Sequence, residues 1–349
     1  MNFNLAILFL VLLVPAFASG DYSENEKAKA LIDGLVNDLD FDRQALESVF
    51  REAKHVPQII EIMNRPAESL YWREYKEIFL QPERIEAGIA FVKDNSEDLK
   101  RAEETYGVAP HIISAIIGVE TYYGKFLGKY RVIDALVTLG FGYPRRAEFF
   151  SEELRHFMIL ACEERIKPFD RDESCHRMNN DSSSGNGRSI DELVGSYAGA
   201  MGYGQFISSS YRNFAVDFDG DGIRDIWTNT TDAIGSVANY FAEHGWIPDA
   251  AILERVSVES DESQVGELAN EDLKPNKTVS EWRSLGINSE SEDDSLAALF
   301  AFRLDDENGV ERNDYVLGFD NFYVITRYNI SRLYARVVYQ LAMDIQNGL

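Results

Sequence analysis

Apolar residues fill nearly every position between residues 112 and 119. This spacing places apolar side chains on almost every face of a helix, so the pattern predicts a helix that is largely buried. Pro110 stands near its start, where a missing backbone N–H costs little, and Gly124 is the predicted stop. Glu120 lies near the end of this helix, directly before Thr121 and two tyrosines.

Helical spacing of apolar residues also dominates most of the remaining chain. Residues 22–107 are predicted to be helical throughout, with the clearest amphipathic stretches at 41–50 and 84–106. The pattern stays mostly helical as far as residue 246, and it returns at 321–343 to close the chain. The sequence therefore predicts a mainly helical protein.

Residues 250–318 differ from the helical regions on either side. The runs 252–258 and 297–304 are compatible with β-strands, and residues 273–276 and 305–309 carry turn signals. Much of the excess acid of the chain lies in the loops between these runs. We predict a small, mostly β insertion with charged, solvated loops.

The first 18 residues are predicted to be a signal peptide. Leu5 to Phe17 is an apolar run too short for a confident transmembrane span, and Ala16 to Ala18 forms an A-x-A cleavage signal. Residues 1–4 carry no Lys or Arg, which is atypical. No Cys follows the apolar run to take a lipid anchor, so we expect a soluble exported protein. An uncleaved N-terminal anchor is the alternative.

Charge and cysteine content narrow the classes of partner and compartment. Lys and Arg number 34 against 59 Asp and Glu, a formal net charge of −25, which argues against nucleic acid and anionic membranes as partners. Cys162 and Cys175 are the only two cysteines. In an oxidising compartment they are predicted to form a disulfide without a catalytic role, with two free thiols as the alternative. The polar stretch 169–188 is predicted to be a surface excursion.

Glu120 is the first candidate for chemistry. A carboxyl group that leaves a buried helix beside aromatic rings is partly desolvated, and desolvation raises the pKa as a general acid requires. Taken alone, the stretch favours the other interpretation, a solvated Glu at a helix end, because catalytic carboxylates are rare among all Glu. The five His are scattered and no G-x-S-x-G turn is present, so neither a zinc site nor a Ser nucleophile is indicated.

An Asp-rich stretch, D-F-D-G-D-G-I-R-D at residues 217–225, matches the first half of an EF-hand-type calcium loop. Thr228 holds the twelfth position, where a bidentate Glu is expected, so the site is predicted to be weak unless Asn229 or Asp232 adds an oxygen. An acidic turn without an ion is the alternative, and any calcium is expected to be structural. The predicted ligand set is Asp217, Asp219, Asp221, Ile223 through its carbonyl, Asp225 and Thr228.

Two further clusters combine small, amide and aromatic residues. Residues 199–206 surround Tyr203 and Gln205 with glycines, which permit close backbone approach to a ligand. Residues 326–334 carry Tyr328, Asn329 and Tyr334, whose flat faces and polar tips suit sugar rings. Each cluster by itself is also compatible with plain helix packing.

Together the clusters form an ordered array that resembles the lytic murein transglycosylase B family of bacterial periplasmic enzymes. The resemblance covers the chain from about residue 31 onward. It is carried by W-x-E-Y (72–75), I-x-G-V-E-T (116–121), Y-P-R-R (143–146), A-G-A-M-G-Y-G-Q-F (198–206), the Asp-rich loop, D-A-I-G-S-V-A-N-Y-F (232–241) and T-R-Y-N (326–329).

The resemblance implies an α+β fold with a lysozyme-like helical core. Its expected parts are a helical N-terminal domain (22–107), a catalytic core (108–249) with its Asp-rich loop (217–228), a small β domain (250–318) and a C-terminal helix (319–349). The implied activity is cleavage of the β-1,4 bond between N-acetylmuramic acid and N-acetylglucosamine in peptidoglycan, leaving 1,6-anhydromuramyl ends. No cofactor is implied for this chemistry.

By match to G-V-E-T, Glu120 would be the single catalytic acid/base. Ordinary glycosidases pair two carboxylates, but no second one is indicated here, so the substrate's acetamido oxygen is expected to assist. Two departures from the family pattern are Ile207 and Ser208, which follow Q-F where Met and Pro are usual. The implied glycan-contacting residues are Tyr75, Ser196, Gln205, Tyr240, Tyr328, Asn329 and Tyr334.

Two other functions stay open at this point. A goose-lysozyme-like hydrolase would use the same fold and the same Glu120, since fold alone does not decide the reaction. A catalytically silent wall-binding protein is the non-enzyme alternative. Peptidoglycan glycan strands are the expected partner in a periplasmic location, and the sequence leaves open any contact with proteins of cell-wall synthesis or division.

Overall fold

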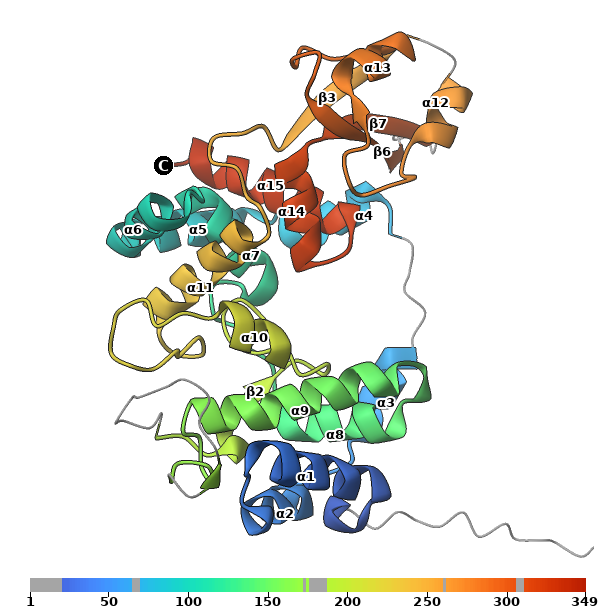
Figure 1. The fold of residues 1–349 in the computed structure, drawn as a ribbon. Helices are drawn as coiled ribbons and strands as arrows, with labels where there is room; N and C mark the ends of the chain where they lie inside the picture. The colour runs from blue at the N-terminus through green and yellow to red at the C-terminus, as the bar shows by residue number, and fades with distance from the viewer. Residues whose placement is uncertain (1–20, 65–69, 172–173, 176–186, 260–261, 306–310) are drawn as a thin grey trace, which may run out of the picture.

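A computed structural model describes residues 21–64, 70–171, 174–175, 187–259, 262–305 and 311–349. The predicted signal peptide and most of the polar excursion lie outside these residues. The described chain is mostly helical with one small sheet, which confirms the predicted fold class (Figure 1). The helices are α1 (Glu26–Leu39), α2 (Arg43–Glu52), α3 (Pro57–Asn64), α4 (Trp72–Phe79), α5 (Pro82–Asp94), α6 (Ser96–Tyr106), α7 (Pro110–Thr121), α8 (Val132–Gly142), α9 (Ala147–Glu163), α10 (Ser208–Phe214), α11 (Thr230–Glu243), α12 (Glu262–Leu268), α13 (Val279–Ser284), α14 (Asp320–Tyr328) and α15 (Arg332–Asn347).

Helix α7 is the buried rod that the apolar run predicted. It packs against α5, α6, α11 and α15, and its residues from Ile112 to Val119 are buried. The predicted stop at Gly124 was wrong. The helix ends at Thr121 because Tyr122 and Tyr123 both adopt left-handed backbone conformations, with φ of 53° and 58°.

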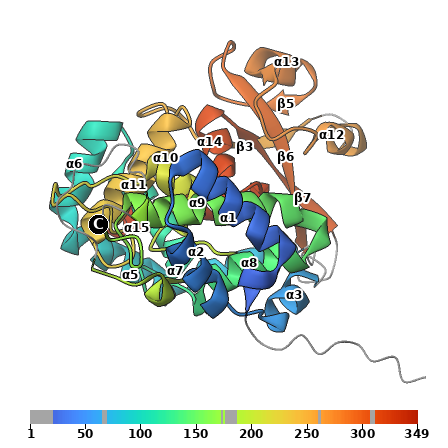
Figure 2. The ribbon, with the colours of Figure 1, turned by 60° about the horizontal axis from the view of Figure 1, so that its bottom comes forward.

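The N-terminal helices fall into two packing groups. In Figure 2, α1 and α2 lie across α8 and α9, and the Phe141 ring of α8 contacts Phe50 of α2 and Tyr22, which lies just ahead of α1. Helices α4, α5 and α6 instead contact α15, α7 and α11. The described residues of the range 22–107 are therefore mostly helical, as predicted, but their helices support two different parts of the core.

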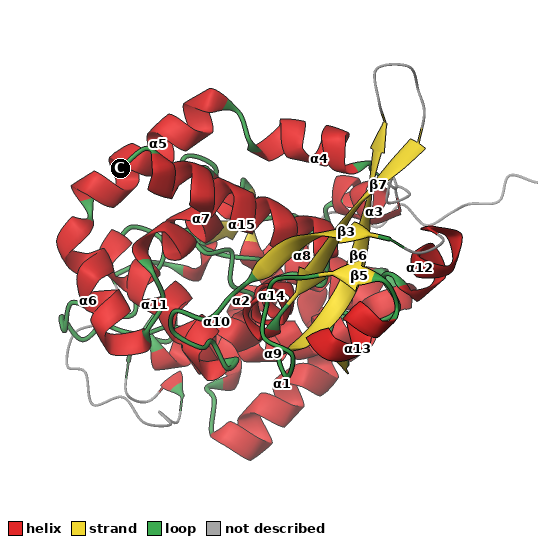
Figure 3. Cartoon of the chain, turned by 90° about the horizontal axis from the view of Figure 1, so that it is seen from above, coloured by secondary structure: helices red, strands yellow, loops and turns green. Residues whose placement is uncertain are grey.

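The small sheet lies within residues 253–318 together with α12 and α13, at the top of the molecule in Figure 1, and Figure 3 shows its yellow strands from above. Its strand order is β4-β6-β7-β3-β5, with every adjacent pair antiparallel. A separate apolar cluster that includes Trp282 and Leu317 fills it. The strands are β3 (Leu253–Val258), β4 (Lys277–Thr278), β5 (Ile287–Asn288), β6 (Leu296–Asp305) and β7 (Glu311–Gly318).

Short elements and one disulfide complete the fold. Strands β1 (Tyr130–Arg131) and β2 (Val194–Gly195) pair antiparallel. Cys162 at the end of α9 is joined to Cys175 by a disulfide. Among the described residues, no helix combines the length and the apolar character needed to cross a bilayer.

Candidate active site

Glu120 lies in the last turn of α7 and keeps partial access to solvent. Its surroundings are dense enough that burial raises the pKa of its carboxyl group to about 7, although a hydrogen bond from Tyr334 opposes this rise. The Tyr334 hydroxyl donates to Glu120 Oε1 at 2.6 Å. Among the described residues, no acidic side chain figures as a cause of the shift. A carboxyl group with this pKa can both donate and accept a proton near neutrality.

Three tyrosines from three helices surround this carboxyl group. Burial, and after it the negative charge of Glu120, raises the pKa values of Tyr75 on α4, Tyr328 on α14 and Tyr334 on α15. The rings of Tyr328 and Tyr334 stack nearly parallel, with centroids 6.5 Å apart and planes 9° apart. The fold therefore brings together residues that the sequence separates by more than two hundred positions.

Tyr328 and Tyr240 continue the aromatic wall away from Glu120. Their rings meet edge to face at 4.7 Å, and both rings contact Phe206. Each hydroxyl is satisfied by a backbone carbonyl, Tyr328 by Gly204 at 2.5 Å and Tyr240 by Arg327 at 2.7 Å. With both hydroxyl groups bonded to the backbone, only the half-buried Tyr328 ring keeps an accessible part that suits an apolar sugar face. The Tyr240 ring is buried and stacks on His244 at 3.9 Å.

The glycine-rich stretch is tied to the end of α7 by Thr121. The buried Thr121 hydroxyl contacts the carbonyl of Tyr203 at 3.0 Å and that of Ile117 in its own helix at 3.1 Å, and it accepts the Gly124 N–H at 3.0 Å. Gly124 has φ of 85°, and a Cβ there would lie 2.2 Å from the Tyr203 ring. Glycine is thus required at this close approach, which explains its position after the helix.

Gln205 and Ser196 make local contacts within their loop. Gln205 has φ of 51°, a left-handed conformation that costs energy for a residue other than glycine. Its side-chain amide donates to the Gly202 carbonyl at 3.0 Å. Ser196 Oγ accepts backbone N–H groups from Ala198 and Ala200. Gln205 and Tyr122 are both held in left-handed backbone conformations, and strained residues of this kind are often found at functional sites.

Asn329 is exposed and lies between α14 and α15. It ends α14 with an extended backbone, and its carbonyl accepts the Ser331 N–H at 2.7 Å. The C-terminal helical region is therefore two helices, with the break at the T-R-Y-N motif. This break directs Tyr328 and Tyr334 toward the same carboxyl group.

The Asp-rich loop has the donors for a hard cation in its first half. The carboxylates of Asp217, Asp219 and Asp221 offer oxygens within 4.8 Å of one another. Their oxygens also accept the backbone N–H groups of Gly220, Gly222 and Ile223, which shapes the loop. Oxygen ligands in this arrangement suit calcium, so the first half fits such an ion.

The second half of the loop is arranged differently from the predicted ligand set. Arg188 donates to Asp225 Oδ2 at 3.3 Å and to Thr228 Oγ1 at 2.8 Å. Asp232 accepts backbone N–H groups from Phe218 and Asp225. The guanidinium group therefore competes with a cation for Asp225 and Thr228, and nothing in the local sequence signalled this partner.

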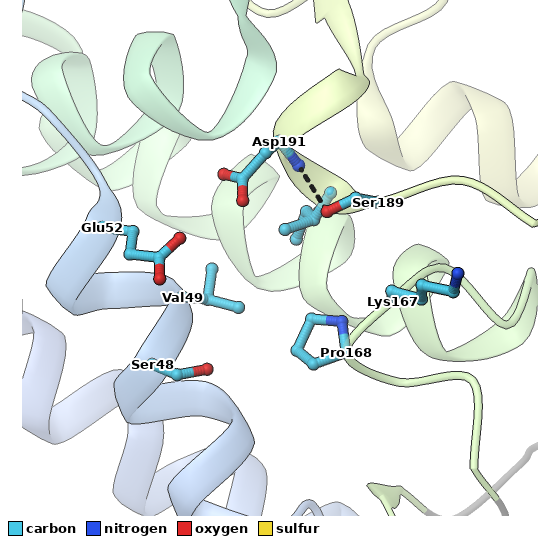
Figure 4. A pocket seen from close by; sticks show the side chains of 8 residues that line it. Ser48, Val49, Glu52, Lys167, Pro168, Ser189 and Asp191 are labelled. Atoms are coloured by element: carbon cyan, nitrogen blue, oxygen red, sulfur yellow. Dashed lines mark hydrogen bonds between the residues drawn. The ribbon is translucent and has the colours of Figure 1, made fainter.

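One pocket lies apart from the residues that surround Glu120. It has a volume of about 180 Å³ and lies between α2 and residues 167–168 and 189–191, as Figure 4 shows. Glu52, Lys167 and Asp191 are its charged residues. None of the predicted site residues lines it, so it adds nothing to the chemistry at Glu120.

Two residues around Glu120 were missed in the sequence. Thr121 stands inside the quoted G-V-E-T motif, so its position next to Glu120 was a usable signal. No signal in the sequence pointed to Arg84. Its guanidinium group donates to the Gly118 carbonyl at 2.9 Å and lies 4.7 Å from the centroid of the Tyr122 ring. A cation near the carbonyl end of α7 stabilises the helix terminus beside Glu120.

Comparison with known proteins shows which family this chain belongs to. Residues 23–343 match the family model described as the transglycosylase SLT domain. The chain is 38% identical over 336 residues to the membrane-bound lytic murein transglycosylase B of Escherichia coli (strain K12), covering 93% of this chain and 84% of that protein. The chain belongs to this transglycosylase family. The resemblance found in the sequence motifs is thereby confirmed.

Solved structures of family members match over nearly the whole chain. Soluble lytic transglycosylase SltB1 of Pseudomonas aeruginosa, crystallised in a catenated form, has a TM-score of 0.81 and 39% identity, with coverage of 94% of this chain and 99% of that chain. Slt35 of Escherichia coli in complex with calcium has a TM-score of 0.79 and 37% identity, with coverage of 94% and 95%. SltB3 of Pseudomonas aeruginosa, in complex with NAG-anhNAM-pentapeptide, has a TM-score of 0.75 and 27% identity, with coverage of 91% and 78%.

Proposed function

We propose that this transglycosylase cleaves the β-1,4 bond between N-acetylmuramic acid and N-acetylglucosamine in peptidoglycan, with Glu120 as its single acid/base. One observation carries the proposal. Burial raises the pKa of the Glu120 carboxyl group to about 7, at the end of a buried helix and beside three tyrosines. The SltB3 complex with a NAG-anhNAM-pentapeptide supports the substrate class, because that protein is similar in structure over most of this chain.

In the first step, protonated Glu120 gives its proton to the glycosidic oxygen that leaves. The bond from this oxygen to C1 of the muramyl sugar breaks, and positive charge develops at C1. Because no acidic side chain of the described residues contributes at Glu120, we assign stabilisation of this centre to the acetamido oxygen of the substrate. The Tyr334 hydroxyl then stabilises the carboxylate that forms, through its 2.6 Å hydrogen bond.

In the second step, the Glu120 carboxylate takes the proton of the muramyl 6-hydroxyl while that oxygen bonds to C1. The 1,6-anhydro ring closes, Glu120 is protonated again, and no water is consumed. Exclusion of water from C1 separates this outcome from hydrolysis. We assign substrate contact to Tyr75, Ser196, Gln205, Tyr240, Tyr328, Asn329 and Tyr334.

We propose a structural role for the Asp-rich loop. Asp217, Asp219 and Asp221 would hold a calcium ion, which would fix the loop ahead of α11 and supply no step of the reaction. The calcium complex of Slt35 supports this role. We further propose a periplasmic location for the mature chain, because its expected substrate lies there.

Product analysis tests the function directly. Purified peptidoglycan is digested with the mature enzyme, and the ends of the fragments are identified by mass spectrometry. We expect 1,6-anhydromuramyl ends from the wild type and a loss of about 10²-fold or more in cleavage by Glu120→Gln. Reducing ends alone would support the goose-lysozyme-like hydrolase. Unchanged cleavage by Glu120→Gln would remove Glu120 from its role, and no cleavage by the wild type would favour the wall-binding alternative.

A further inference from the structure

Helix α4 brings Tyr75 to Glu120, yet Trp72 is the one residue of this helix that is buried. Beside Trp72, the junction of α4 with α15 contains a hollow of about 430 Å³, whose lining includes Leu80, Gln340 and Asp344. The two helices thus leave part of their junction unfilled. Tyr75 lies about one turn beyond Trp72 on the same helix.

Arg336 on α15 holds Trp72. Its guanidinium carbon lies 4.2 Å from the centroid of the Trp72 ring and 4.3 Å from the centroid of the Phe302 ring. The two rings also meet each other edge to face at 5.9 Å. Because Phe302 belongs to β6, one side chain joins α15, α4 and the sheet. Figure 1 shows α4 where these elements meet.

The charge of Arg336 is balanced from the sheet. Its Nη2 donates to Asp314 on β7, whose side chain is only 5% exposed. A buried guanidinium group needs such a partner, because an unpaired buried charge is strongly destabilising. Asp314 also accepts from Arg255, but that side chain is 72% exposed. Arg336 therefore differs from Arg255 in reaching inward to α4.

We propose that Arg336 is a positioning residue that clamps α4 between α15 and the β sheet. In this way it keeps water out of the side of the site that Tyr75 forms. We call Trp72, Phe302, Asp314 and Arg336 the Arg336 clamp. The inference rests on the proposed function, because only a transglycosylase needs water kept from C1. It gives the small sheet a part in deciding the reaction outcome.

Two consequences follow from loosening the clamp while the protein stays folded. Water that enters beside Tyr75 competes with the muramyl 6-hydroxyl for C1, so the share of reducing muramyl ends increases. The same water solvates Glu120, whose pKa is raised mainly by burial and then falls toward its ordinary value. The other titratable groups facing Glu120, namely Tyr75, Tyr328 and Tyr334, stay neutral at these pH values because their own pKa values are raised.

The test compares Arg336→Met with Arg255→Met in the full mature enzyme. Each variant removes one guanidinium group from Asp314, but only Arg336→Met releases the ring of Trp72. Circular dichroism and thermal melting establish that each variant is folded. Anhydro and reducing ends are then counted by mass spectrometry, kcat/KM is measured against pH, and the Glu120 carboxyl group is titrated by ¹³C NMR.

For Arg336→Met we expect kcat/KM to fall about tenfold, the share of reducing ends to increase, and the alkaline limb of the pH profile to move to lower pH. Arg255→Met should retain wild-type values for all three. A folded Arg336→Met enzyme with unchanged product ratio and alkaline limb would overturn the proposal, even if its melting temperature were lower. If the folded variant is inactive, an unchanged Glu120 titration overturns the proposal and a lowered pKa supports it.

Trp72→Leu provides the second variant if Arg336→Met does not fold. It removes the ring that links α4 to Arg336 and leaves the ion pair with Asp314 in place, and the same changes are expected. Glu120→Gln separates this inference from the function itself. An active Glu120→Gln enzyme contradicts the proposed function, whereas an inactive one with unaltered Arg336→Met and Trp72→Leu products contradicts only the clamp.

Discussion

The hydroxyl group of Tyr334 donates a 2.6 Å hydrogen bond to Oε1 of Glu120, across 214 positions of sequence. Tyr334 itself is buried in the first turn of α15, where its ring stacks on Tyr328. A donor favours the charged form of a carboxyl group, whereas burial disfavours it. The pKa of Glu120 is therefore set by two opposed effects from different ends of the chain.

Removing this donor should raise the pKa of Glu120. In Tyr334→Phe, burial acts on the carboxyl group without opposition, so the alkaline limb of kcat/KM should move to higher pH. We expect a loss of about tenfold in kcat/KM at neutral pH, since a hydrogen bond to a charged group contributes roughly 1.5–3 kcal/mol. The measurement is a pH-rate profile on peptidoglycan fragments.

Tyr339→Phe is the matched control, because Tyr339 lies on the same helix and is only partly buried. It should retain the wild-type profile. An alkaline limb in Tyr334→Phe that stayed in place would mean that the hydrogen bond does not tune the acid.

Glu120 should also make folding stability depend on pH. Its pKa is about 7 in the folded protein against the ordinary 4.5. Between these values the unfolded chain has released a proton that the folded protein still holds, so stability falls as the pH rises from 4.5 to 7. Glu120→Gln removes this loss, and it should stabilise the protein by on the order of 2 kcal/mol at pH 8.

Thermal melting at pH 4 and pH 8 measures this difference. The gain from Glu120→Gln should be present at pH 8 and absent at pH 4. Glu97→Gln, an exposed change on α6, should show no such contrast. Equal effects of Glu120→Gln at both pH values would argue that the folded carboxyl group has an ordinary pKa.

Calcium should stabilise the Asp-rich loop. A chelator is expected to lower the melting temperature of the purified protein, and added calcium is expected to restore it, because an ion bound only by the folded state adds to stability. Asp221→Asn should abolish the response to calcium. Asp294→Asn, an exposed acidic position in the β domain, should leave it intact. A melting temperature that neither agent shifts would indicate an empty loop.

Loss of the Thr121 hydroxyl group should lower both the stability and the activity of the protein. Thr121→Val preserves the shape but removes the contact to the Tyr203 carbonyl, at a cost of about 1–3 kcal/mol for a buried group left unpaired. Because this contact ties the glycine-rich loop to the end of α7, we expect lower kcat/KM as well as lower stability.

Thr105→Val is its control, since that hydroxyl donates only to a carbonyl of its own helix. Chemical denaturation and kinetics should separate the two variants. If Thr121→Val behaved like Thr105→Val in both assays, the contact between the end of α7 and the glycine-rich loop would contribute to neither stability nor activity.

Local sequence was sufficient where the physical cause is local. The apolar run at 112–119 could bury itself only as an enclosed helix, and that is how α7 is packed. The runs 252–258 and 297–304 were compatible with strands and lay beside turn signals, and β3 and β6 cover nearly the same residues. The end of α7 was misplaced because Tyr122 and Tyr123 already adopt left-handed conformations ahead of Gly124, whose φ is also positive.

Long-range partners could not be read from the chain. The sequence by itself determined the helical class, the family motifs and Glu120 as the candidate acid. Only the tertiary structure placed Tyr334 on that carboxyl group, Arg188 on Asp225 and Arg336 between Trp72 and Phe302. The reason is physical: helix formation and apolar burial depend on neighbouring residues, whereas a pKa or an ion pair depends on whichever group the fold places within a few ångströms.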